Sequence, residues 1–143
     1  MELNFFSENI TFEIAQPELL TQWIANTAAA EANSISTLNI IFCDDAYLYD
    51  MNVQYLDHDT LTDVITFQYN TAPVEGDIFI SVERTAENAA DLGVSAEQEL
   101  HRVIIHGTLH LLGYGDKTPS DKAQMTSKEN YYLSQLELLA SKA

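Results

Sequence analysis

The sequence predicts a single α+β domain, residues 1–143, in which a mixed four-stranded sheet packs against about five helices. The length of 143 residues fits one domain. A hydrophobic content of 46% supplies a core, yet no apolar run reaches the roughly 20 residues needed to span a bilayer. The periodicity runs through strands and helices in turn and ends in consecutive helices, an order that favours an α+β arrangement.

The first half of the chain is expected to form strands over 10–14 and 38–42 and helices over 17–33 and 45–55. Apolar and polar residues alternate in the first of these strands. Pro17 suits the first turn of the first helix. Asp44 or Asp45 can cap the second helix.

The second half is expected to form strands over 62–69 and 77–82, a turn over 72–76, and helices over 83–91, from 96 and from 119. Gly93 can end the first of these helices. Ser95 and Gln98 have the spacing of a capping box. Thr118 is the expected N-cap of the last helix, and Pro119 suits its first helical position. The order of the strands in the sheet does not follow from these patterns.

The helix from residue 96 carries two histidines on an otherwise apolar surface. A helix that is apolar nearly all round is buried, and its remaining stripe contains His106 and His110. Residues four apart on a helix have Cβ atoms roughly 5–6 Å apart, so both imidazoles can reach one ion. We expect a metal site on this buried helix and the turn after it.

The third ligand is predicted to be Asp116. Gly113 can stop the helix and Gly115 can turn the chain, which returns Asp116 toward the histidines. The spacing from His106 to Asp116 matches the metzincin pattern of metal ligands. Two histidines and one carboxylate leave a position for water, as in catalytic zinc sites, so one divalent ion, zinc, is expected to serve hydrolysis.

Two features limit the chemistry of this site. A zinc protease normally carries glutamate directly after the first histidine as its general base, whereas this chain has Gly107. The net charge is −16, with 22 acidic residues against six Lys and Arg, and nonspecific nucleic-acid binding usually shows a basic footprint. The basic residues nevertheless flank the histidine segment, and Arg84, Lys117 and Lys122 are the candidates for substrate binding.

The string from His106 to Asp116 resembles the signature of the YbeY-type endoribonucleases, bacterial metal-dependent enzymes of ribosomal RNA maturation and ribosome quality control. That signature reads His, Gly, any residue, Leu, His, Leu, any residue, Gly, Tyr, Asp, His. The chain agrees through Tyr114 and then has Gly115 and Asp116 in place of the aspartate and the third histidine.

Two further segments resemble the same family. The first is Asn52, Tyr55, Asp59, Thr62-Asp63-Val64 and Phe67, and the second is Gly76-Asp77-Ile78 with Ser81. The family usually has arginine directly after the tyrosine and proline before the Thr-Asp pair, and this chain has Leu56 and Leu61 there.

The resemblance implies hydrolysis of a phosphodiester in single-stranded RNA, and ribosomal RNA, the ribosome and ribosomal proteins as partners. No general base is evident, and His58 and Asp63 are the catalytic candidates. Cys43 is the only cysteine and the N-terminus shows no signal-peptide pattern, so we expect a cytoplasmic protein. Two alternatives stay open: a factor of ribosome biogenesis whose metal is mainly structural, and a metallohydrolase of a non-nucleic substrate.

Overall fold

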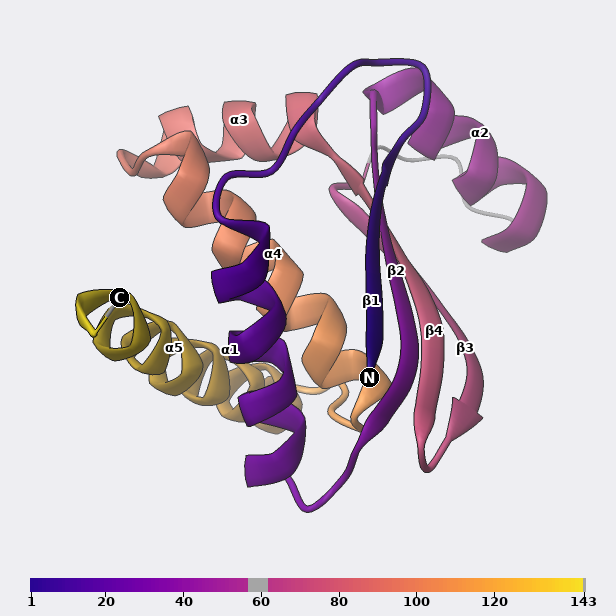
Figure 1. Cartoon of the computed structure of the whole chain (residues 1–143). Coiled ribbons are helices and arrows are strands. Elements are labelled where there is room, and N and C mark those ends of the chain that lie inside the picture. Colours follow the sequence, from indigo (N-terminus) through magenta and orange to yellow (C-terminus); the bar gives the residue numbers. More distant parts are fainter. Residues whose placement is uncertain (57–61, 143) are drawn as a thin grey trace.

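The computed structural model describes residues 1–56 and 62–142 (Figure 1). The elements are β1 (Glu2–Ser7), α1 (Pro17–Ala30), β2 (Ile35–Cys43), α2 (Asp45–Leu56), β3 (Val64–Thr71), β4 (Val74–Ser81), α3 (Val82–Leu92), α4 (Ala96–Leu111) and α5 (Pro119–Ser141). Strands and helices follow one another in the predicted order, and the α+β class is confirmed.

The sheet has the order β1-β2-β4-β3. β1 pairs with β2 and β2 with β4 in parallel, whereas β3 pairs with β4 in antiparallel fashion. The prediction of a mixed four-stranded sheet is therefore confirmed. β3 is an edge strand, and its hairpin with β4 places it furthest from the N-terminal strand.

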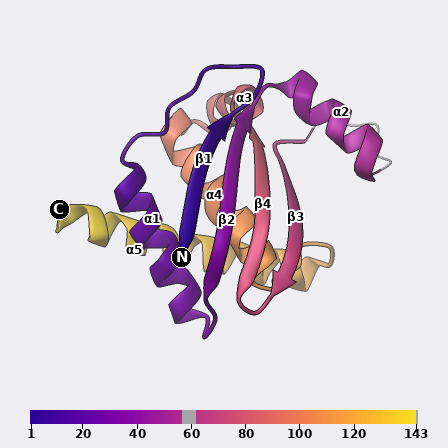
Figure 2. The same cartoon turned by 45° about the vertical axis from the view of Figure 1, so that its right-hand side comes forward.

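The helices cover the two faces of the sheet unequally (Figures 1 and 2). α1 and α4 lie on one face, with α5 packed outside them, and the main core fills this side. The indole of Trp23 in α1 donates to the Tyr132 carbonyl of α5 at 2.7 Å, which ties the outer helix to the inner layer. Of the described elements, α2 is the one helix on the other face, where it lies at one end over a smaller cluster around Leu48 and Ile65. No helix in the described part of the chain is long and apolar enough to cross a membrane.

Two glycines let α4 approach the sheet closely. A Cβ atom at Gly107 would lie 3.0 Å from Cγ2 of Ile78 in β4. A Cβ atom at Gly76 would lie 2.7 Å from the Phe67 carbonyl oxygen and 3.0 Å from Cδ1 of Leu111. Neither position has room for a side chain, so the depth of the histidine-bearing helix in the fold depends on both glycines.

The predicted strand over 10–14 is wrong, because the first strand is β1 and residues 11–14 have no regular structure. The Ser7 hydroxyl donates to the Phe12 carbonyl at 2.8 Å and accepts from the Phe12 N–H at 3.3 Å, which folds the chain back after β1. The Phe12 ring then packs on Phe42, with centroids 4.8 Å apart. The alternation in this segment reflects a loop that buries alternate side chains against the core.

Two boundaries also differ from the expectation. α1 ends at Ala30 rather than near residue 33, because Ala32 adopts a left-handed conformation with φ 57°. The predicted turn over 72–76 is confined to Ala72 and Pro73, and β4 already begins at Val74. Gly76 lies inside this strand, where the close approach of Phe67 and Leu111 requires a glycine. Its assignment to the turn was therefore wrong.

Candidate metal centre

His106 and His110 lie one turn apart on the face of α4 that is not covered by the sheet. Their ring centroids are 4.5 Å apart and the rings are nearly perpendicular, at 88°. Their side chains are 22% and 25% exposed, respectively, while the neighbouring positions of the helix are mostly buried. The predicted stripe of two accessible imidazoles on a buried helix is present.

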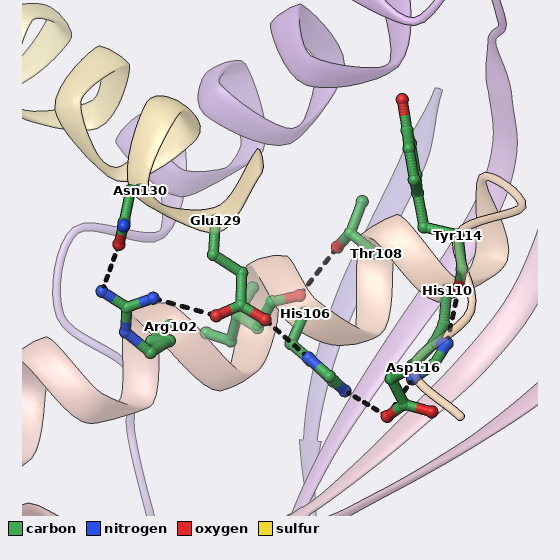
Figure 3. Close-up of polar contacts among 9 residues, drawn as sticks. Arg102, His106, Thr108, His110, Tyr114, Asp116, Glu129 and Asn130 are labelled. Carbon is green, nitrogen blue, oxygen red and sulfur yellow. Dashed lines mark hydrogen bonds and ion pairs between the residues drawn. The ribbon is translucent and has the colours of Figure 1, made fainter. Parts of the chain in front are cut away.

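The turn after α4 brings a carboxylate to the same place. Gly113 has φ 109°, and the Tyr114 N–H donates to the Leu109 carbonyl at 3.0 Å, so the chain reverses at the end of the helix. Asp116 Oδ2 then lies 3.4 Å from His106 Nε2 and 3.2 Å from His110 Nε2 (Figure 3). The three ligand atoms lie within 4.8 Å of one another, a group that could hold a metal ion.

The other ring nitrogen of His106 is held by a buried carboxylate. Glu129 of α5 is only 6% exposed, and its Oε2 lies 2.7 Å from His106 Nδ1. Its second oxygen accepts from Arg102 Nη1 at 2.9 Å, and Arg102 Nη2 donates to Asn130 Oδ1 at 2.8 Å. Figure 3 shows this row of polar groups running from α5 across α4 to Asp116. A carboxylate on the far nitrogen fixes the tautomer and the orientation of a metal-binding imidazole.

His110 is oriented in the same way by the backbone. Its Nδ1 lies 2.8 Å from the Tyr114 carbonyl oxygen and donates to it, so in the neutral ring the lone pair is on Nε2, the atom 3.2 Å from Asp116 Oδ2. Both histidines therefore direct Nε2 to a common point, while both Nδ1 atoms are used elsewhere. This donor set and its outer partners fit a divalent metal.

The electrostatics of the centre favour a cation. Burial by itself lowers the pKa of His106, but the hydrogen bond to Glu129 and the negative charges of Glu129, Asp116 and Asp63 outweigh it and raise this pKa above its usual value. The same charges that attract a proton to His106 would attract a metal ion, so the two compete for the site.

A second polar network fixes the turn that carries Asp116. Glu31, at the C-terminal end of α1, accepts hydrogen bonds from the hydroxyl groups of Tyr114 and Tyr132. Lys128 Nζ lies 3.1 Å from Glu31 Oε2 and 5.5 Å from the centroid of the Tyr114 ring. Because the Tyr114 backbone holds His110, Glu31 links α1 and α5 to the geometry of the candidate centre.

The remaining predicted residues lie in different surroundings. Asp63 is close enough to the cluster for its charge to raise the pKa of His106, and its carbonyl accepts from the Ser81 N–H at 3.0 Å. Arg84 is not free, because it pairs with Asp45 at 2.8 Å and with Glu87 at 2.6 Å. Lys117 and Lys122 are exposed just after Asp116. His58 lies outside the described residues.

The sequence interpretation missed Glu129 and Glu31. Glu129 does leave a signal, because it occupies the same helical stripe as the buried residues Met125, Tyr132 and Leu136. An acidic residue at a core position of an amphipathic helix needs a buried partner. Glu31 leaves no such signal, since it follows α1 in a chain segment rich in alanine and its partners are more than 80 residues away.

The fold and the cluster together define a class of protein: a small α+β domain with a histidine–histidine–carboxylate site that could bind a metal. The family model described as Endoribonuclease YbeY matches residues 3–137, and the chain belongs to this family. The resemblance seen in the sequence is thereby confirmed.

Individual relatives agree with the family model. The chain is 45% identical over 131 residues to Endoribonuclease YbeY of Amoebophilus asiaticus, covering 90% of this chain and 89% of that one. It is 48% identical over 126 residues to Endoribonuclease YbeY of Flavobacterium psychrophilum, covering 87% and 90%. The solution structure of a Thermotoga maritima protein superposes with a TM-score of 0.66 at 24% identity, covering 94% of this chain and 88% of that one, which shows a shared fold.

Proposed function

We propose that this chain is a zinc-dependent endoribonuclease that cleaves single-stranded RNA, with ribosomal RNA as its substrate during maturation of the ribosome. The observation that carries the proposal is the convergence of His106 Nε2, His110 Nε2 and Asp116 Oδ2. Membership of the Endoribonuclease YbeY family supplies the reaction class. Cytoplasmic location and contact with the ribosome or ribosomal proteins are part of the same proposal.

His106, His110 and Asp116 would hold the ion, and Glu129 and the Tyr114 carbonyl would keep the two rings in place. A divalent ion held there would act as a Lewis acid toward a phosphoryl oxygen and a water molecule. The partial exposure of the three ligands leaves access for a substrate from the solvent side.

Other residues have supporting roles in this proposal. Asp63, whose charge already acts on His106, is the candidate proton acceptor within the described residues. Lys117 and Lys122 are exposed beside the turn and are the candidates for contact with backbone phosphates. Arg84 is a weaker candidate, because Asp45 and Glu87 already neutralise it.

Peptide hydrolysis by the usual zinc-protease route has no support in the packing of α4. The position that would carry the general base is Gly107, and it has no room for a longer side chain because Ile78 lies against it. The helix that binds the ion is therefore built for close contact with the sheet rather than for a glutamate at this position.

The test is cleavage of RNA by the purified protein. Metal-loaded protein should cleave a single-stranded oligoribonucleotide and leave a duplex of the same sequence intact, and His106→Ala and His110→Ala should abolish cleavage. Metal analysis of protein purified without added metal should find zinc. A metal-loaded protein that bound RNA but never cleaved it would contradict the proposed activity and favour a factor of ribosome biogenesis with a structural metal. A different native metal would contradict only the assignment of zinc and not the proposed activity.

A further inference from the structure

The face of the sheet opposite α4 contains an aromatic groove between α2 and the strands β3 and β4. Its volume is about 640 Å³. Among the residues that the structure describes, five aromatic side chains line it: Tyr47, Tyr55, Phe67, Tyr69 and Phe79. Figure 2 shows that α2 lies at one end of this face.

The aromatic rings are held in a fixed arrangement. Phe67 makes edge-to-face contacts with Tyr55 and Phe79, with centroids 6.0 Å and 5.8 Å apart. The Tyr69 hydroxyl donates to Asp77 Oδ2 at 2.8 Å, and Asp77 Oδ1 accepts from Asn39 at 3.0 Å. These contacts pre-organise the ring faces, because each ring is fixed by a neighbour or by a hydrogen bond.

Two of the rings lie largely in solvent. Tyr55 and Tyr69 are each 65% exposed, although they border an apolar groove. Tyr69 lies on β3 and Tyr55 on α2. Exposed aromatic rings are the surfaces on which unpaired bases stack in single-stranded RNA recognition. Stacking needs a π-face and no positive charge.

The edge strand β3 connects this groove with the candidate metal centre. Gln68, which lies between the two groove residues Phe67 and Tyr69, points the other way and donates to the Leu111 carbonyl of α4 at 2.8 Å. Leu111 directly follows His110. α4, whose C-terminal end leads into the turn that carries Asp116, also packs against β3. A strand of RNA that passes around the outer edge of β3 would therefore meet both places.

The charge of the groove specifies which part of a nucleic acid it can bind. Among the described residues that line it, Asp50 is the one with a charged side chain, so backbone phosphates gain nothing there. The whole chain carries a net charge of −16, and three of its six basic side chains, Arg84, Arg102 and Lys128, are already paired with carboxylates. Contacts to bases are therefore the interactions that this groove can offer an RNA strand.

We propose that the groove of Tyr47, Tyr55, Phe67, Tyr69 and Phe79 is a base-stacking site for unpaired nucleotides of the RNA strand that the metal centre cleaves. The identity of the ligand rests on the proposed function, whereas the site rests on the exposed rings and on their place along β3. It would hold the strand by its bases while Lys117 and Lys122 contact phosphates near the metal.

The experiment measures RNA binding without cleavage. Protein treated with chelator is titrated into a fluorescent single-stranded oligoribonucleotide of about 12 nucleotides, a length within the range of known single-strand sites. The double variant Tyr55→Ala/Tyr69→Ala should bind about tenfold more weakly than the unchanged protein. Tyr55→Phe/Tyr69→Phe should bind more tightly than the double alanine variant, because both rings remain, and only slightly more weakly than the unchanged protein, because Tyr69 loses its hydrogen bond to Asp77.

Two controls separate stacking from general loss of structure or of charge. Tyr131→Ala removes a tyrosine that is 53% exposed on α5, away from the sheet, and should leave binding unchanged. An oligonucleotide with abasic sites keeps its phosphates but lacks the bases that would stack. The unchanged protein and the double alanine variant should bind it with equal affinity. The salt dependence of binding should be equal for both proteins, since no phosphate contact is removed.

Equal RNA affinity for the double alanine variant and Tyr131→Ala would overturn the proposal, even if the groove then proved to bind a protein. Tight binding of the abasic oligonucleotide, or no RNA binding by the unchanged protein, would also overturn it. Because the assay uses metal-free protein, failure of cleavage in the metal-loaded protein counts against the proposed activity and not against this site.

Discussion

Glu129 Oε2 lies 2.7 Å from Nδ1 of His106, across the interface between α5 and α4. The carboxylate is buried, and Arg102 balances its charge from the other side at 2.9 Å. A residue 23 positions further along the chain thus holds Nδ1 and leaves Nε2 of His106 facing the candidate centre. Such outer carboxylates raise the basicity of the ligand and keep its ring in place.

Glu129→Gln should weaken metal binding by about 10- to 100-fold without abolishing it, because the three ligands remain and only the charged partner of His106 is lost. Competition with a chromophoric chelator measures this affinity. Glu137→Gln is the matched control, an exposed glutamate on the same helix, and should bind metal as the unchanged protein does. A Glu129→Gln affinity within threefold of the unchanged protein would show that the carboxylate does not orient the ligand.

The three candidate ligands, His106, His110 and Asp116, make a second prediction about stoichiometry. We expect about one metal ion per chain, lost in His106→Ala and in His110→Ala, and more weakly held in Asp116→Ala. Asp116→His should retain the ion if the Gly115 turn admits the longer side chain. Elemental analysis of the purified variants measures all four.

His101→Ala serves as the control for the ligand variants. His101 lies on the same helix, but its ring packs edge-on against Trp23, with centroids 6.2 Å apart, and it takes no part in the cluster. Its replacement should leave the metal content unchanged. Full metal content in Asp116→Ala would remove Asp116 from the ligand set and restrict its role to the turn.

The parts of the site that the sequence predicted are those encoded by local spacing. His106 and His110 are four apart on one helix, and glycines beyond them return Asp116, so no knowledge of the tertiary fold is needed. The mixed sheet followed from the order of periodic segments in the same way. The strand order and β1 could not be predicted in this way, because β1 pairs in parallel with β2, some 35 residues away. The predicted first strand was wrong because Phe12 packs on Phe42 from a loop in which apolar and polar residues alternate as they do in a strand.

The residues that the sequence could not supply act over long separations. Glu31 and Tyr114 are 83 positions apart, and nothing near either one indicates the other. The groove beneath α2 is similar, since Tyr55 and Tyr69 come together only when β3 folds back beside the helix. Glu129, an acidic residue on an apolar stripe of α5, indicates that a buried partner exists, but the sequence does not identify that partner.

The network around Glu31 should make stability depend on pH. Burial raises the pKa of Glu31, but hydrogen bonds from Tyr114, Tyr132 and Lys128 and the charge of Lys128 outweigh it, and the pKa lies below its usual value. A depressed carboxyl pKa contributes stability that is present above the unfolded pKa and lost as pH falls through the folded pKa. Glu31→Gln should therefore lower the free energy of unfolding by about 2 kcal/mol at pH 7.

The loss in free energy of unfolding caused by Glu31→Gln should shrink as the solution is acidified below the ordinary glutamate pKa, since Glu31 of the unchanged protein itself becomes protonated. Urea denaturation at several pH values measures the difference. Glu13→Gln, an exposed acid outside the network, should show no such convergence with the unchanged protein. A deficit of Glu31→Gln that stayed constant from neutral to acidic pH would mean that the charge of Glu31 contributes nothing.

The close approach of α4 to β4 gives the last prediction. Alanine in the middle of a helix is ordinarily more favourable than glycine by about 1 kcal/mol. At Gly107, however, the added Cβ atom would lie 3.0 Å from Cγ2 and 3.1 Å from Cδ1 of Ile78, a fully buried side chain that would have to shift. Gly107→Ala should therefore destabilise the protein, by about 1–3 kcal/mol, the range for overpacked cores.

A double-mutant cycle with Ile78→Val tests this cause, because valine lacks the Cδ1 atom and so removes one of the two close contacts. Ile78→Val should cost less in the Gly107→Ala background than in the unchanged protein, which gives a measurable coupling energy. Urea denaturation with an unchanged slope measures each corner of the cycle. His106 is adjacent to Gly107, and His110 lies about one helical turn further on. If the added methyl group pushes α4 away from β4, Gly107→Ala should therefore also bind metal more weakly. A Gly107→Ala protein that was more stable than the original would show that helix propensity outweighs the contact and that the sheet yields to the extra methyl group.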